Sequence, residues 1–162
     1  MAGRVLSDAS PLIGLGYVDG LSWLQQLFGA VWIPQEVNAE LITGQGFAGE
    51  AALLQAQANG WFRLAGPTPS TPALPDLDEG EAACIRTALA DAQPALLLMD
   101  ERAGRAVATA KGLKVAGTAA VIGIAKQRGL IALAKPVFER LHGSDFRISA
   151  EVIGVVLRRV GE

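Results

Sequence analysis

Histidine and cysteine are almost absent from this chain of 162 residues, which contains one of each, His142 and Cys84. A single cysteine excludes a disulfide within the chain and any cysteine-rich zinc site. A single histidine excludes every mechanism that needs two imidazoles, and Ser144 and Asp145 lie too close to His142 in sequence to form a catalytic triad with it. Cys84 lies in an apolar helical segment, where we expect a small core residue.

Long apolar runs and targeting signals are also missing. The run from 20 to 35 carries no charge, but glutamines and a proline interrupt it, so it is too short and too polar to span a bilayer. An acid, Asp8, stands where a secretory signal peptide would need an apolar stretch. The sequence therefore predicts a soluble, cytoplasmic protein with no membrane partner.

Two common phosphate-handling motifs are incomplete. The segment 112–118 has the glycines and the threonine of a P-loop, but the lysine that should precede Thr118 is missing. A phosphatase with an aspartate nucleophile would need a second aspartate two residues after Asp8, where Ser10 stands. These two classes of phosphate chemistry are therefore disfavoured.

Charge is divided unevenly along the chain, although the net charge is only −2. Residues 1–101 hold twelve acids and three bases, whereas residues 102–162 hold four acids and eleven bases. Such an asymmetry hints at a polyanionic partner. The alternative is that the two halves interleave in space, so that their charges mix.

Apolar segments of strand and helix character alternate along the chain, and 51% of the residues are hydrophobic. This pattern predicts an α/β fold with a central parallel sheet covered on both faces. We expect one domain over residues 1–162, with a proline-rich connector at 66–75 and a C-terminal helical tail at about 135–160. Two details of the helices are also predicted: a cap at Ser10 before Pro11, and an inward tail face of Ile148, Val152, Val155 and Val156.

Two aspartates follow predicted strands. Asp8 comes directly after the strand at 4–7, and Asp100 directly after the strand at 95–99. The carboxyl ends of parallel strands form the ligand-binding edge of an α/β sheet, so both side chains are expected at that edge. Aspartate is equally a favoured helix N-cap, and this second interpretation stays open for both residues.

Glutamates add to this predicted edge. Glu81 forms a capping-box pattern with Asp78, yet it shares a helical stripe with Ile85 that should face the sheet. Glu36 and Glu40 lie one turn apart, and a solvated helix face is the alternative interpretation for them. Crowded acids repel each other unless a cation sits among them, and Mg²⁺ or Mn²⁺ prefers carboxylate oxygens.

Five segments of the chain, in this order and at these spacings, resemble PIN-domain proteins of the VapC-like toxin ribonuclease branch. The resemblance covers nearly the whole chain and implies a three-layer α/β/α sandwich with a central parallel sheet. The segments that carry it are Val5–Leu12, Ile33–Leu41, Leu77–Ala82, Leu98–Arg102 and Val115–Thr118, the last followed by Ala125–Ile131.

The resemblance also implies a set of site residues. The acidic residues with a catalytic role would be Asp8, Glu40, Glu81 and Asp100. Asp8, Glu81 and Asp100 would bind Mg²⁺ or Mn²⁺, where many relatives have Asp in place of Glu81. Ser10 and Thr118 would supply supporting hydroxyl groups. Arg102 and Arg105 are candidates for contacts to the RNA backbone, and the alternative is that these two arginines only keep the surface soluble.

As a function, the resemblance implies a divalent-metal-dependent endoribonuclease that hydrolyses RNA phosphodiester bonds. It would be the toxin or toxin-related component of a toxin–antitoxin pair, bound by a small antitoxin protein and forming a homodimer. The alternative is a catalytically silent PIN-like binding module that acts through a partner or by dimerising. Trp23, Trp32 and the tail at 152–156 could serve either as such an interface or as core.

Overall fold

The computed structural model describes residues 3–162 and builds them around five parallel strands in the order β3-β2-β1-β4-β5. The central strand pairs on both sides, with Leu6 opposite Trp32 in one neighbour and opposite Leu97 in the other. The strands are β1 (Val5–Ser7), β2 (Val31–Ile33), β3 (Phe62–Leu64), β4 (Leu96–Leu98) and β5 (Lys114–Ala116).

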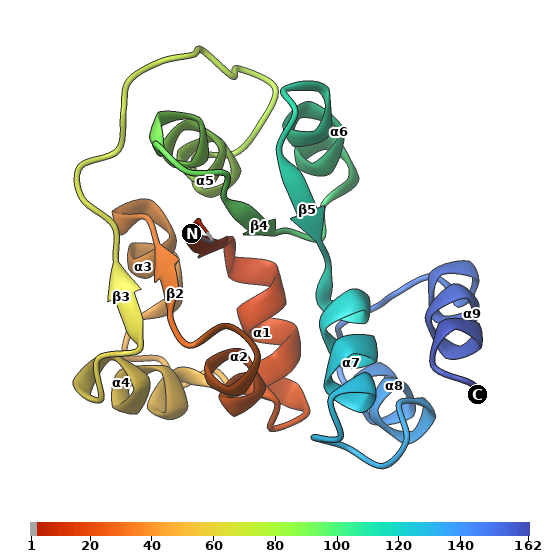
Figure 1. The fold of residues 1–162 in the computed structure, drawn as a ribbon. Helices are drawn as coiled ribbons and strands as arrows, with labels where there is room; N and C mark the ends of the chain where they lie inside the picture. The colour runs from red at the N-terminus through yellow and green to blue at the C-terminus, as the bar shows by residue number, and fades with distance from the viewer. Residues whose placement is uncertain (1–2) are drawn as a thin grey trace.

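Helices cover both faces of this sheet (Figure 1). Those of residues 3–162 are α1 (Ala9–Tyr17), α2 (Leu21–Phe28), α3 (Gln35–Leu41), α4 (Glu50–Ala58), α5 (Glu79–Ala90), α6 (Arg102–Ala110), α7 (Thr118–Gln127), α8 (Lys135–His142) and α9 (Ala150–Arg159). In Figure 1, α5 and α6 lie in the upper part of the view, and α1, α2, α4 and α7 lie in the lower part. The predicted three-layer α/β/α sandwich is confirmed.

The core lies on both faces of the sheet, as the apolar strand sequences predict for a parallel sheet. Within β4, for example, Leu97 and Leu98 are completely buried. The proline-rich connector at 66–75 runs outside this core, between β3 and α5. The largest fully buried side chains are Leu6, Leu12, Leu15, Leu24, Ile33, Leu53, Phe62, Ile85, Leu97, Leu98, Met99 and Ile122.

The start of α1 differs from the prediction. The helix begins at Ala9 with Asp8 in the N-cap position, so the prediction that Ser10 is the cap is wrong. Ser10 and Pro11 lie inside the first turn instead. Proline is tolerated in the first turn because the backbone N–H groups there have no partner within the helix, so Pro11 does not fix the starting residue.

The predicted tail consists of two helices, and the prediction of its inward face is right for Val156 but wrong for Val152 and Val155. Val152 and Val155 are 45% and 36% exposed, whereas Val156 is buried. The reason is that α9 packs on α7, where Val156 lies directly over Gly123: a methyl group there would come within 2.8 Å of Val156 Cγ1. The partly buried neighbours on this face are Ile153, Leu157 and Val160, while Ile148 is half-buried before the helix.

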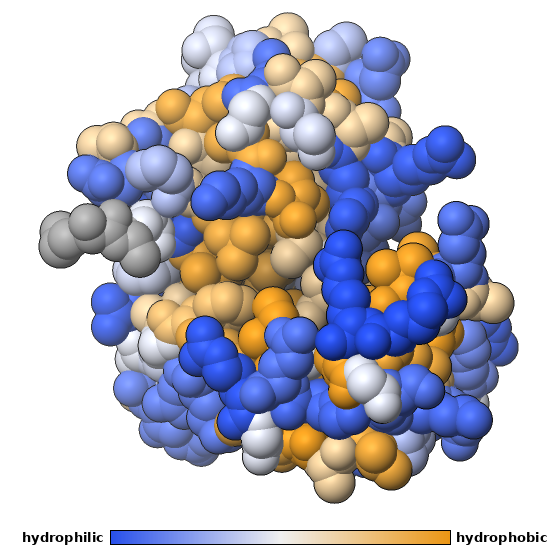
Figure 2. Space-filling model, turned by 45° about the vertical axis from the view of Figure 1, so that its right-hand side comes forward, coloured by the Kyte–Doolittle hydropathy of each residue, from blue (hydrophilic) through white to orange (hydrophobic). Residues whose placement is uncertain are grey.

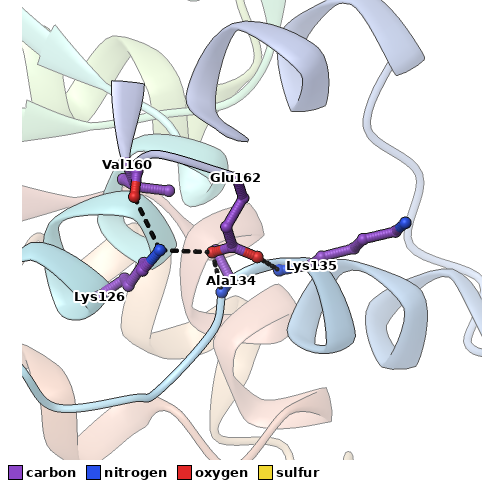
Figure 3. A network of polar contacts seen from close by, with 5 residues as sticks. All are labelled: Lys126, Ala134, Lys135, Val160 and Glu162. Atoms are coloured by element: carbon purple, nitrogen blue, oxygen red, sulfur yellow. Dashed lines mark hydrogen bonds and ion pairs between the residues drawn. The ribbon is translucent and has the colours of Figure 1, made fainter. Parts of the chain in front are cut away.

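A polar network ties the end of α9 to the two preceding helices (Figure 3). The Glu162 carboxylate accepts hydrogen bonds from the backbone N–H groups of Ala134 and Lys135 at 2.6 and 3.0 Å, and lies 3.2 Å from Lys126 Nζ. Burial raises the pKa of Glu162, but these hydrogen bonds and the Lys126 charge outweigh it, so the pKa is lowered. Lys126 also donates to Val160 O, which fixes α9 to α7.

The two tryptophans considered for an interface have different environments. Trp23 is only 8% exposed and belongs to the core. Trp32 is half-buried on β2, where the guanidinium groups of Arg4 and Arg63 lie 5.7 and 5.2 Å from its ring centroid. Within residues 3–162, no helix combines the length and apolar character needed to cross a membrane.

Candidate functional site

Asp8 and Asp100 lie at the same edge of the sheet because they follow neighbouring parallel strands. Ser7, the last residue of β1, pairs with Leu98, the last residue of β4. The backbone N–H of Asp8 continues this pairing by donating to Leu98 O at 2.9 Å. Both aspartates therefore lie at the carboxyl edge of the sheet, where ligands bind in folds of this kind.

Asp8 occupies an N-cap position without forming a side-chain cap hydrogen bond. Its side chain is buried, and Oδ1 lies 3.0 Å from the point where a methyl group on Gly80 would stand. Glu40 Oε2 lies 3.4 Å from the same point. Both carboxylates therefore lie next to Gly80 at the start of α5, where a larger residue would crowd them.

The pKa of Asp8 is raised from 3.8 to about 7. Burial is the largest cause, because a buried carboxylate loses its hydration. The Ala9 backbone N–H opposes the rise, and the charges of Asp78, Glu81 and Glu40 add to it. Every side-chain charge acting on Asp8 is thus negative, as expected where a cation belongs.

Glu81 is buried at the first turn of α5 and has two roles in the structure. It completes a capping box: its backbone N–H donates to Asp78 Oδ1 at 2.8 Å, and its Oε2 accepts from the Asp78 N–H at 3.3 Å. Its other oxygen, Oε1, is buried and has no hydrogen-bond partner among the described residues. Burial raises the pKa of Glu81, helped by Asp78, Glu101 and Glu40. Asp78 is therefore the N-cap of α5, as predicted, and Glu81, the predicted site residue, is its capping-box partner.

Asp100 is not a helix cap, because Glu101 holds the N-cap position of α6. Its Oδ1 accepts from the Thr118 N–H at 2.8 Å and its Oδ2 from the Thr118 hydroxyl at 2.7 Å. Burial raises its pKa, while the Thr118 hydrogen bonds and Arg105 oppose this rise. Thr118, which is fully buried, thus fixes the orientation of the Asp100 carboxylate.

The other predicted site residues differ in their exposure and contacts. Glu40 is exposed at the rim, and burial of its carboxylate and the charge of Asp78 raise its pKa. Arg105 donates from Nη1 to Met99 O at 3.1 Å. Arg102 is exposed at the start of α6. Ser10 makes no side-chain hydrogen bond within residues 3–162, so its supporting role stays a prediction.

Sequence reasoning missed three residues that shape the site. Asp78, treated as a cap alone, also raises the pKa of Asp8. Gly80 admits the Asp8 and Glu40 carboxylates, and Gly104 admits Glu81, because a methyl group on Gly104 would lie 2.8 Å from Glu81 Oε1. The acids of the run Asp78–Glu81 already indicated a concentration of negative charge at this position. The requirement for glycine at positions 80 and 104 could not be read from the sequence, because it arises from contacts with residues distant in sequence.

The donor set suits a hard divalent cation, although no three His, Cys, Asp or Glu side chains of the described residues gather closely enough to form a metal-binding group. Mg²⁺ keeps several waters and needs only one or two protein carboxylates. The unpartnered Glu81 Oε1 supplies one oxygen, and Asp8 lies among negative charges that a cation would neutralise. The residues therefore fit Mg²⁺ or Mn²⁺ by their chemistry.

A family model described as PIN domain matches residues 4–162. This chain is a PIN-domain protein. The match spans every strand and helix described above, including α8 and α9. A search of curated proteins found no match to it. Membership of the PIN-domain family supports a nuclease fold, which agrees with a carboxylate site at the edge of a parallel sheet.

Proposed function

We propose that this PIN-domain protein is a divalent-metal-dependent endoribonuclease. The observation that carries the proposal is the convergence of Asp8, Glu40 and Glu81 from three separate segments, with a buried Glu81 oxygen that has no partner. Like charges held near one another are costly, the more so because Asp8 and Glu81 are buried, so a fold that keeps them together needs a reason. Binding a cation for phosphodiester hydrolysis is such a reason.

Each site residue has a distinct task in this proposal. Asp8, Glu81 and Asp100 would hold Mg²⁺ or Mn²⁺, and Thr118 keeps Asp100 oriented through two hydrogen bonds. The Asp78 N–H holds Glu81 Oε2 and leaves Oε1 available. When bound, the cation would lower the pKa of a water molecule and offset the charge that grows on the phosphate oxygens.

A histidine base has no place in this site. The His142 side chain accepts a hydrogen bond from the Ile148 N–H at 3.2 Å, in the loop between α8 and α9. The carboxylates are thus the titratable groups on which activation of water would depend. Glu40, exposed at the rim with a raised pKa, is the one best placed to exchange a proton with solvent.

The test is cleavage of a labelled pool of structured RNAs by partner-free protein, at low salt with Mg²⁺ or Mn²⁺. We expect the wild type to cut unpaired RNA and EDTA to abolish cutting. Asp8→Asn should lose nearly all activity with an unchanged circular dichroism spectrum, because asparagine keeps the size but not the charge of the ligand. Absence of cleavage of any RNA would instead favour the silent binding module.

The toxin role is part of the same proposal. A toxin ribonuclease should arrest growth when it is expressed alone in a bacterial host, and Asp8→Asn should not. The proposed antitoxin partner should relieve the arrest, and the proposed homodimer should elute at twice the monomer mass. Growth arrest that persists in Asp8→Asn would show that arrest does not depend on the carboxylate site.

A further inference from the structure

A pocket of about 920 Å³ opens beside the carboxylate site, between α6 and the segment that enters α9. Asp100 and Gly117 form its end nearest the site, and the opposite wall is formed by Arg147, Ile148, Ser149 and Val152. We call it the α6–α9 groove. Its size is in the range of pockets that enclose small ligands or one or two nucleotides.

The charge of the α6–α9 groove is opposite to that of the carboxylate site. Arg102, Arg105 and Arg147 are among the described residues that line it, and Asp100 is the only acid among these. The Arg102 side chain makes no hydrogen bond or ion pair among the described residues. Arg147 is held by its Nη1, which donates to the carbonyls of His142, Ser144 and Phe146, so its other N–H groups remain available.

Between these arginines the groove is apolar. Ala106 and Ala110 line it from α6, and Ile148 and Val152 line it from the other wall. Val152 is 45% exposed, so this wall is accessible to a ligand. Figure 2, which brings the α9 side forward, shows hydrophobic residues exposed among strongly hydrophilic ones. An apolar surface flanked by guanidinium groups suits a base and its phosphates together.

The charge asymmetry of the sequence is also present in space. In Figure 1 the chain up to α5 lies mostly to the left, and α6 to α9 lie to the right. The acidic first 101 residues and the basic last 61 residues therefore do not interleave. A polyanion approaching the carboxylates is repelled from the α3 and α5 side and attracted from the α6–α9 side.

We propose that the α6–α9 groove binds the unpaired RNA nucleotides next to the cleaved bond. Arg102 and Arg147 contact their phosphates, and the wall at Ile148 and Val152 packs against a base. This inference rests on the proposed ribonuclease function, because it names where the substrate of that site lies. Arg147 and Val152 thereby become substrate-positioning residues in a part of the chain far in sequence from the acids.

The test is the affinity of a fluorescein-labelled, single-stranded 12-nucleotide RNA, measured by anisotropy in EDTA so that no cleavage occurs. We expect Arg102→Gln with Arg147→Gln to weaken binding at least tenfold and to reduce the slope of log K against log salt by about 1 to 2. Arg159→Gln, an exposed arginine on α9 outside the groove, should change the affinity less than twofold.

A second pair of variants tests the apolar wall without changing charge. Val152→Ser should weaken RNA binding about threefold or more. Val155 is exposed on the same helix but lies outside the groove, so Val155→Ser should leave RNA binding unchanged. Both side chains are exposed, so neither substitution should prevent folding. If Arg147→Gln disrupts the loop whose carbonyls Arg147 contacts, Arg102→Gln alone tests the contribution of the groove arginines to RNA affinity.

The outcomes separate this inference from the proposed function. Cleavage by the wild type with Mn²⁺, together with unchanged RNA affinity in the groove variants, would overturn the groove and leave the nuclease intact. Loss of affinity in the groove variants without wild-type cleavage would support the groove and overturn the nuclease. If Val152→Ser abolished dimerisation while RNA affinity stayed unchanged, the groove would be a protein interface and the inference would be wrong.

Discussion

Replacing Asp8 by asparagine should stabilise the metal-free protein above neutral pH. Asp8 is buried among Asp78, Glu81 and Glu40, and its pKa is raised from 3.8 to about 7. A carboxyl group whose pKa is higher in the folded state than in the unfolded chain is protonated more readily in the folded state. Between pH 3.8 and about 7 the folded state therefore holds a proton that the unfolded chain has lost, and stability falls as pH rises.

The magnitude follows from the two pKa values. Each tenfold change in the proton equilibrium corresponds to about 1.4 kcal/mol, so the ionised Asp8 costs the fold up to about 4 kcal/mol above pH 7. Asparagine has nearly the same shape and carries no charge. In EDTA at pH 8, Asp8→Asn should raise the free energy of unfolding by a few kcal/mol, which corresponds to on the order of 10 °C in melting temperature.

The assay is urea unfolding of both proteins at pH 5 and pH 8 in EDTA. The wild type should lose stability between these two pH values, and Asp8→Asn should lose less. Glu79→Gln is the matched control, because Glu79 is exposed at the start of α5, the helix that carries Glu81, and does not act on the pKa of Asp8. If Asp8→Asn unfolds at a lower urea concentration than the wild type at pH 8, the electrostatic reasoning is refuted.

Three further substitutions test other parts of the site and fold. Gly80→Ala should reduce activity at least tenfold without changing any charge, since its methyl group would lie 3.0 Å from Asp8 Oδ1; a cleavage assay measures this, and full activity would contradict it. Thr118→Val removes the hydroxyl bonded to Asp100 and should cost about 1–3 kcal/mol of stability in urea unfolding. Glu162→Ala should lower the melting temperature clearly at pH 7 but little at pH 3. The pKa of Glu162 is lowered from 4.5 in the folded state, so its contacts stabilise the fold above pH 4.5 and are lost as the carboxylate is protonated. An equal fall in melting temperature at both pH values would contradict this.

The fold and the edge of the site could be predicted from local sequence. Short apolar strands alternating with amphipathic helices predict the parallel sheet, and an acid directly after a strand must lie at its carboxyl end. The Asp78–Glu81 capping box was also evident from spacing alone. These features depend on neighbours within a few residues, which the sequence displays directly.

Features that depend on distant contacts could not be predicted in the same way. The closeness of Glu81 to Gly104 arises from the packing of α5 beside α6. The inward face of α9 was misjudged because it depends on where α7 offers a glycine, at Gly123. The role of Thr118 was implied only by the family resemblance, and its two hydrogen bonds to Asp100 join residues 18 apart in sequence.

The most direct test of the central claim is calorimetric titration of the metal-free protein with Mn²⁺. If Asp8, Glu81 and Asp100 form a cation site, the wild type and Glu79→Gln should bind Mn²⁺ alike, and Asp8→Asn should bind it at least tenfold more weakly. Equal Mn²⁺ affinity in the wild type and Asp8→Asn would contradict the claim that these carboxylates hold the cation.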